Sequence, residues 1–256
     1  MTFGVSIVIL TFNGLPYTQQ CIEAIRKHTT DYQIVVVDNH STDGSLEWLK
    51  EQDDVALYPQ VRNEGFATGC NIGVGYARYG SVCLLNNDCI PQEGWLDALR
   101  GSFTKGVGIV GARLVLPNGK LQHAGVYWQK REKDWLPYHR YMHLPARIDE
   151  ASQTMEVPAV TGACMLTNRT VWNRVGGMDD GYMQANFEDI DFCMKVRETG
   201  QRIIYEPKAV LMHYHSMTIK ECQKDPDQNP ARYYQANFQR LMAKWQTKLD
   251  GGMNAV

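Results

Sequence analysis

The stretch that decides the fold is Val5-Ser6-Ile7-Val8-Ile9-Leu10-Thr11-Phe12-Asn13. It opens with a short, nearly continuous apolar run, which is typical of a strand covered on both faces of a sheet. The run then changes abruptly to the polar side chains of Thr11 and Asn13. Because ligands of open α/β sheets bind at the carboxyl ends of the strands, this change predicts a binding site at the end of a buried strand.

Similar apolar runs recur in the first part of the chain, at residues 33–37, 55–58, 82–85 and 108–110. Helical spacing separates them at residues 16–28, 45–52 and 66–79. This alternation predicts right-handed βαβ units, and therefore an α/β fold with a doubly wound, mostly parallel central sheet. The third helix contains Gly69, Gly73 and Gly75, which weaken a helix and need a reason such as close packing.

The pattern loosens after Pro117-Asn118-Gly119, which predicts a hairpin turn. Residues 127–152 are aromatic and basic without clear periodicity, and we expect a mobile or partner-facing loop there. Regular structure should resume at 157–166, in a helix at 186–198, in strands at 202–205 and 210–213, and in an amphipathic helix at 231–249. The apolar face of that last helix, which favours core packing, carries Tyr234, Phe238, Leu241, Met242 and Trp245.

The composition narrows the class of protein. The 256 residues fit a single domain, and a formal net charge of -2 gives no electrostatic reason to expect nucleic acid as the main ligand. Seven cysteines without a C-x-x-C pair predict buried, reduced thiols in the cytosol rather than a disulfide framework or a zinc site. The first residues lack the basic region and cleavage site of a signal peptide, and their apolar run is too short to span a bilayer.

Two more strands end as the first one does. Residues 35–37 lead into Asp38-Asn39, and residues 84–85 lead into Asn86-Asn87-Asp88. Each pattern alone is also typical of a turn, but the three together predict one polar edge of the sheet. Asp88 is a hard oxygen ligand suited to Mg2+ or Mn2+, which share carboxylates with substrate phosphates. Asp38 can accept from a nucleobase N–H or can cap the turn that follows it.

Carboxylates gather again in Asn186-Phe187-Glu188-Asp189-Ile190-Asp191. With Asn186 as the helix cap, Glu188 and Asp189 lie in the first turn, where the helix dipole favours anions. Repulsion between them would raise at least one pKa toward that of a useful general base.

His213 and His215 share one face at the end of a late strand. One of them binds a metal, or the two form a hydrogen-bonded surface pair.

These stretches resemble the family 2 nucleotide-sugar glycosyltransferases with the GT-A fold, and most of all their bacterial rhamnosyltransferase-like branch. The resemblance follows the same order along nearly the whole chain. It is carried by residues 5–13, 36–45, 63–73, 85–88, 161–165, 176–179 and 187–193. It implies a Rossmann-like central sheet flanked by helices, with a smaller portion on the acceptor side.

The resemblance also implies roles for individual residues. The nucleotide pocket would be lined by Thr11, Asn13, Asp38, Asn63, Phe66 and Asn87. A divalent ion, Mn2+ or Mg2+, would be held by Asp88 with His213, although Asn86 stands where the family's Asp-x-Asp-type motif has its first acid. Glu188 and Asp189 would form the catalytic acidic pair, with Asp189 as the general base. Gly162 and Ala163 would contact the donor sugar and the acceptor.

The implied activity is an inverting, metal-dependent transfer of a sugar from a nucleoside diphosphate, such as a dTDP-rhamnose or UDP-sugar donor, to an acceptor hydroxyl. The acceptor would be a saccharide or lipid-linked saccharide in cell-surface polysaccharide or glycolipid synthesis. The chain would be cytoplasmic, with peripheral association at the inner face of the plasma membrane. Its single domain would comprise a nucleotide-binding half at 1–115, an acceptor and catalytic half at 116–225 that includes the 127–152 loop, and a C-terminal helix at 226–256.

Two other readings compete with this one. A sugar-phosphate nucleotidyltransferase also uses aspartate-bound Mg2+, but it should carry a Gly-rich phosphate loop with a basic residue near its N-terminus. The stretch Leu10-Thr11-Phe12-Asn13-Gly14 lacks that loop. A non-catalytic nucleotide- or carbohydrate-binding protein is the second alternative, and it would bind a donor without releasing a diphosphate.

Overall fold

The computed structural model describes residues 4–214, 222–223 and 225–253. Its helices are α1 (Leu15–His28), α2 (Ser45–Lys50), α3 (Gly65–Gly75), α4 (Trp95–Ser102), α5 (Arg169–Val175), α6 (Glu188–Glu198) and α8 (Pro230–Lys248), with short turns η1 (Asp149–Ala151) and η2 (Leu249–Met253). Its strands are β1 (Val5–Thr11), β2 (Tyr32–Asp38), β3 (Val55–Pro59), β4 (Ser81–Asn86), β5 (Cys89–Pro91), β6 (Val107–Val115), β7 (Leu121–His123), β8 (Val126–Arg131), β9 (Asp134–His139), β10 (Met155–Glu156), β11 (Cys164–Asn168) and β12 (Arg202–His213).

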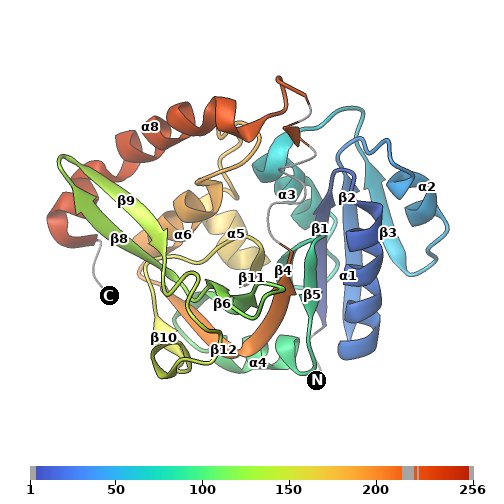
Figure 1. The fold of residues 1–256 in the computed structure, drawn as a ribbon, viewed down its shortest axis with the longest axis horizontal. Coiled ribbons are helices and arrows are strands. Elements are labelled where there is room, and N and C mark those ends of the chain that lie inside the picture. Colours follow the sequence, from blue (N-terminus) through green and yellow to red (C-terminus); the bar gives the residue numbers. More distant parts are fainter. Residues whose placement is uncertain (1–3, 215–221, 224, 254–256) are drawn as a thin grey trace.

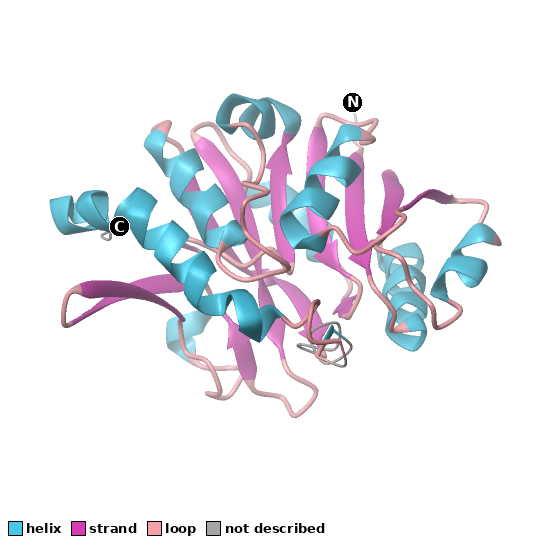
Figure 2. Cartoon of the chain, turned by 90° about the horizontal axis from the view of Figure 1, so that it is seen from above, coloured by secondary structure: helices cyan, strands magenta, loops and turns pink. Residues whose placement is uncertain are grey.

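One large sheet runs through the molecule in the order β10-β12-β6-β11-β4-β1-β2-β3. The strands β3, β2, β1, β4, β6 and β12 point the same way, while β11 lies antiparallel between β4 and β6. Figure 1 shows these strands side by side, and Figure 2 shows helices on both sides of them. The predicted mostly parallel α/β fold is confirmed.

Alternate side chains of β1 enter two separate cores, which explains why the strand is apolar along its length. Val8 packs into one core with α3, α5, α6 and α8, whereas Ile7 and Ile9 pack into the other with α1, α2 and α4. Successive side chains of a strand point to opposite faces. A sheet covered on both faces therefore selects apolar residues at every position of its central strands.

The glycines of α3 allow this helix to lie unusually close to β1. A Cβ atom at Gly69 would overlap the side chain of Leu10, and one at Gly73 would overlap Val8 Cγ1. A Cβ at Gly75 would meet nothing within 4 Å. Close packing is therefore the reason for Gly69 and Gly73, but it does not account for Gly75.

We expect Gly73→Ala to lower the free energy of unfolding by about 1–3 kcal/mol, the usual cost of overpacking a filled core. Gly75→Ala is the matched control, because it adds the same methyl group to the same helix in open space. That control should stabilise the protein by about 0.4–1 kcal/mol through the lower entropy of its unfolded chain. Urea denaturation measures both values, and equal effects at the two positions would contradict the packing argument.

Three elements differ from the sequence-based expectations. Residues 127–152 are not a loop without structure, because β8 and β9 form an antiparallel hairpin there. The strands expected at 202–205 and 210–213 are one strand, β12, with an irregularity in its pairing between Glu206 and Val210. The structure expected from residue 157 becomes a strand only at Cys164.

Other expectations about the second half are confirmed. Gly119 has a φ of 76° in the turn between the antiparallel strands β6 and β7. The amphipathic helix α8 packs into the first core through Leu241, Met242 and Trp245. Within the described ranges, no helix is long and apolar enough to cross a bilayer.

Candidate active site

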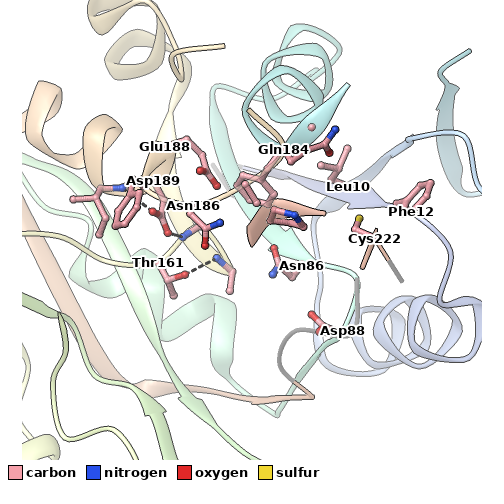
Figure 3. A pocket seen from close by; sticks show the side chains of 18 of the residues that line it. Leu10, Phe12, Asn86, Asp88, Thr161, Gln184, Asn186, Glu188, Asp189 and Cys222 are labelled. Atoms are coloured by element: carbon pink, nitrogen blue, oxygen red, sulfur yellow. Dashed lines mark hydrogen bonds between the residues drawn. The ribbon is translucent and has the colours of Figure 1, made fainter. Parts of the chain in front are cut away.

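A cavity of about 300 Å³ lies at the carboxyl ends of β1 and β4. Its wall combines the ends of these strands with the loop before β11 and the start of α6. In Figure 3, Asp189 and Thr161 lie at one end of the cavity and Asp88 at the other, with Asn86 between them. The cavity therefore brings together the two acidic segments that the sequence singled out.

The parallel register aligns the polar strand ends as expected. Thr11 of β1 pairs with Asp38 of β2, and Leu10 pairs with Asn86 of β4. Of the predicted site residues in the described chain, the cavity is lined by Asn63, Phe66, Asn87, Asp88, Gly162, Ala163, Glu188, Asp189 and His213. The cavity wall does not include Thr11, Asn13 or Asp38.

Thr11 and Asn13 hold together the loops beside the cavity. The Thr11 hydroxyl accepts from Asn87 Nδ2 at 3.2 Å. Asn13, with a φ of 56°, accepts a hydrogen bond on Oδ1 from the backbone N–H of Thr42 at 2.8 Å. These contacts fix the conformation of the loop that follows β1. Thr11 and Asn13 therefore hold residues next to the cavity in place without lining it.

Asp38 and Asn39 carry unpaired oxygen atoms near the same edge. Asp38 Oδ2 accepts from the N–H of Ser41, as a turn cap does, while its buried Oδ1 has no hydrogen-bond partner in the described part of the chain. Asn39 lines the cavity, and its Nδ2 donates to Asn63 Oδ1 at 3.1 Å. Buried polar atoms without partners are uncommon, and they mark places where a ligand or water donates.

Asp88 and His213 meet at the other end of the cavity. His213 Nε2 lies 3.1 Å from Asp88 Oδ1, and both side chains are at most 5% exposed. The pairing of β12 with β5, which sets His213 opposite Cys89, brings them together. His213 Nδ1 lies 3.2 Å from Gln122 Oε1, so the tautomer that is protonated on Nδ1 donates to Gln122. In that tautomer Nε2 is the nitrogen that faces the Asp88 carboxylate.

A carboxylate oxygen and an imidazole nitrogen at this separation suit a divalent ion. Donor atoms about 2.1 Å from an octahedral ion lie about 3 Å apart, and carboxylate and imidazole groups both bind Mn2+. The Cys89 thiol lies close enough to join them. Burial raises the pKa of this thiol well above the usual value, and Cys89 Sγ donates to the carbonyl oxygen of Ala163. His215, the alternative ligand, lies outside the described residues.

Glu188 and Asp189 begin α6 at the opposite end. The expectation that Asn186 caps this helix is wrong: the cap is Phe187, whose side chain makes no capping hydrogen bond. Gln184, Asn186 and Phe187 all have positive φ, a conformation that costs free energy and is concentrated at functional sites. This loop therefore places the carboxyl groups of Glu188 and Asp189 in the cavity wall.

The two neighbouring carboxyl groups differ in environment. Asp189 accepts the backbone N–H of Gly162 at 2.9 Å on Oδ2 and that of Ile190 at 2.8 Å on Oδ1, so both of its oxygen atoms have hydrogen-bond donors. Glu188 is 5% exposed. Burial raises its pKa well above the usual value, and Asp189 adds to the shift. The repulsion expected from the sequence therefore acts on Glu188.

Two cavity residues were missed by the sequence analysis. Gln122 of β7 lines the cavity, and so does His139 of β9, which lies within the supposed loop. His139 Nδ1 lies 2.9 Å from Nδ1 of the buried His123, and burial lowers the pKa of both rings. Val126 and Trp128 of β8 are buried, whereas Tyr127 between them is exposed.

The glycosyl transferase family 2 model matches residues 6–176, which is most of the chain. The chain belongs to this family. The matched segment includes Asp38 and Asp88, at the ends of β2 and β4, and the loop before β11. Helix α6 lies beyond it. The predicted resemblance to family 2 glycosyltransferases is therefore confirmed, and the nucleotidyltransferase reading loses its support.

Individual relatives of this family 2 glycosyltransferase are distant. A Sinorhizobium fredii protein described as "Uncharacterized protein y4gI" is 28% identical over 256 residues, covering 95% of this chain and 28% of the relative. The N-acetylglucosaminyl-diphospho-decaprenol L-rhamnosyltransferase of Mycobacterium tuberculosis (strain CDC 1551 / Oshkosh) is 24% identical, covering 93% of this chain and 84% of the relative. The chain thus spans just over a quarter of the first relative.

The fold of this family 2 glycosyltransferase is also found in solved structures. A crystal structure of GalNAc-T7 with UDP, GalNAc and Mn2+ superposes with a TM-score of 0.67 at 17% sequence identity, over 82% of this chain and 44% of that one. At this identity the match shows the fold, which is the expected GT-A type. The crystal of that neighbour contains a nucleotide, a sugar and a divalent ion.

Proposed function

We propose that this glycosyltransferase transfers a sugar from a nucleoside-diphosphate donor to an acceptor hydroxyl with inversion at the anomeric carbon. The observation that carries the proposal is the arrangement of one cavity, with Asp189 at one end and the Asp88–His213 pair at the other. A base and a cation-binding pair on opposite sides of a bound sugar suit a single in-line displacement. No nucleophile of the protein is needed for such a displacement.

Asp88 and His213 are the residues that would hold Mn2+ or Mg2+, and Gln122 fixes the orientation of the imidazole. A bound divalent ion would neutralise the charge that develops on the departing diphosphate. Asn86 in place of a first acid leaves fewer carboxylates at this end, so the imidazole of His213 supplies the second ligand in the proposal. Hydrogen bonds to a metal-binding histidine also set its tautomer and raise its basicity.

Asp189 is the proposed general base. Two backbone hydrogen bonds hold its carboxylate in place, and it lines the cavity, where it can approach an acceptor hydroxyl. Gly162 keeps the space beside it open, because a Cβ there would lie 2.9 Å from Phe66 Cε1 and 3.4 Å from Asp189 Cβ. The Gly162–Ala163 turn is therefore suited to a sugar that is bound against the backbone.

The nucleoside would lie near Asn39 and Asn63, beside the unpaired oxygens of Asp38 and Asn39. The acceptor would enter on the side where Val126, Pro137 and His139 of the hairpin line the cavity. The mycobacterial relative's name, together with the family resemblance, supports a dTDP-rhamnose or UDP-sugar donor and a saccharide or lipid-linked acceptor in cell-surface polysaccharide or glycolipid synthesis. We place the reaction in the cytoplasm, at the inner face of the plasma membrane.

A thermal-shift panel of nucleoside diphosphates and their sugars, with and without Mn2+, tests this proposal. One nucleobase should raise the melting temperature only when Mn2+ is present, because a ligand at 100 times its Kd stabilises the folded state by about 2.7 kcal/mol. Diphosphate release from the stabilising donor should then follow when an acceptor is supplied. Binding without diphosphate release across a panel of acceptors would favour the non-catalytic reading instead.

A further inference from the structure

Glu188 has a buried oxygen atom that nothing in the described chain contacts by a hydrogen bond. Its Oε2 is this atom, and the side chain lies in the cavity wall. Figure 3 shows the Glu188 side chain beside that of Asp189. A buried carboxylate oxygen without a donor is costly, whereas a protonated carboxyl in the same place offers a hydrogen to a bound ligand.

Among the residues that the structure describes, no positively charged group contributes to the pKa shift of Glu188. Asp189, on the same helix, carries a like charge, and the facing group on α3 is the Cys70 thiol. Burial raises the pKa of Cys70 well above its usual value, with further contributions from Glu188 and Asp189. Backbone N–H groups of Glu188 and Asn186 favour the charged form, but they are outweighed by burial and by Asp189.

We propose that Glu188 is held as a neutral carboxylic acid whose Oε2–H donates a hydrogen bond to an oxygen atom of a sugar bound in the cavity. Asp189 is then the member of the pair that keeps the role of base. The proposal rests on the proposed transferase function for the identity of the ligand. It divides an acidic pair into one group that binds the sugar and one group that removes the proton.

The charge of Glu188 is measured without any substrate, through the pH dependence of stability. A carboxyl group whose pKa is raised by folding adds stability that is complete below the unfolded value of about 4.3 and is lost as pH rises through the folded pKa. Over that window the unfolding constant of the wild type should rise relative to that of Glu188→Gln by up to about tenfold per pH unit. The matched control Glu198→Gln, at an exposed position of the same helix, should not show this trend.

The hydrogen bond itself is measured by comparing Glu188→Gln with Glu188→Ala. The amide of glutamine is neutral and still donates, whereas alanine does not. We expect Glu188→Ala to lower kcat/KM by about tenfold to a hundredfold, the equivalent of one lost hydrogen bond to a substrate. Glu188→Gln should lose clearly less, and it should lack the decline in kcat/KM that we expect of the wild type as rising pH ionises Glu188.

The proposal is overturned if Glu188→Gln loses transfer as fully as Asp189→Asn does and its stability keeps a constant difference from the wild type across pH. That pair of results would show an ionised Glu188 that acts as a second anion. A wild-type protein that turns over no donor would instead refute the proposed function. The stability comparison would still decide the charge of Glu188, so the two failures are distinguishable.

Discussion

Asp189→Asn should lower the rate of sugar transfer by about 10²–10⁴-fold, the contribution that a positioned general base usually makes. Asparagine preserves the size of the side chain and can still accept the N–H of Gly162, so the cavity wall is retained. It cannot take a proton from the acceptor hydroxyl. Steady-state transfer assays with the donor selected by thermal shift measure the effect.

The control for this variant is Asp191→Asn, two residues further along α6. Asp191 is fully buried and accepts hydrogen bonds from Lys244 at 3.0 Å and from Trp245 Nε1 at 2.7 Å, away from the cavity. Loss of its charge should lower stability and leave the rate of the folded protein near that of the wild type. Asp189→Asn should do the opposite and retain donor binding. Near-normal turnover of Asp189→Asn would remove Asp189 from the role of base.

Asp88→Asn and His213→Gln should both abolish the Mn2+-dependent part of donor binding. Each removes one of the two groups whose ligand atoms lie 3.1 Å apart. Losing a partner that only orients a metal ligand usually costs about 10–100-fold in metal affinity. We expect Gln122→Leu to fall in that range, because Gln122 contacts His213 Nδ1, and we expect the two ligand variants to exceed it.

Titration of Mn2+ in the presence of the selected nucleoside diphosphate, followed by thermal shift, ranks the three variants. A chelator in excess should reproduce the effect of Asp88→Asn on the wild-type protein. Transfer that continues unchanged in excess chelator would refute the metal proposal, while leaving the role of Asp189 open to its own test.

Local sequence patterns were sufficient to predict those elements in which the burial of each position determines its residue type. The strands of the first half were predicted because both faces of the sheet are buried, which makes their apolar runs continuous. Asp38 and Asn86 could be placed at one edge because parallel strands end together. The hairpin of β8 and β9 escaped prediction because Tyr127 faces outward while Val126 and Trp128 face inward, so an exposed aromatic side chain hid the alternation.

Other errors arose where the chain conformation depends on distant contacts. Glu206 and Lys208 interrupt the apolar run of β12 and suggested a gap between two strands. Glu206 is in fact 4% exposed and accepts from Thr154 at 2.9 Å. The cap of α6 was assigned to Asn186 by residue type alone. The positive φ values of Asn186 and Phe187 instead belong to a loop whose neighbour, Gln184, accepts the backbone N–H of Phe66.

By itself, the sequence determined the doubly wound sheet, the polar edge at the ends of β1, β2 and β4, and the family. These follow from periodicity and from residues close together in the chain. Only the tertiary structure decided that His213 lies against Asp88, 125 positions away, and that Glu188 is enclosed beside Asp189. Such pairs depend on strand register and burial. The two neighbouring carboxyl groups differ because both oxygen atoms of Asp189 accept backbone hydrogen bonds, whereas Oε2 of Glu188 is buried and has no hydrogen-bond partner in the described chain.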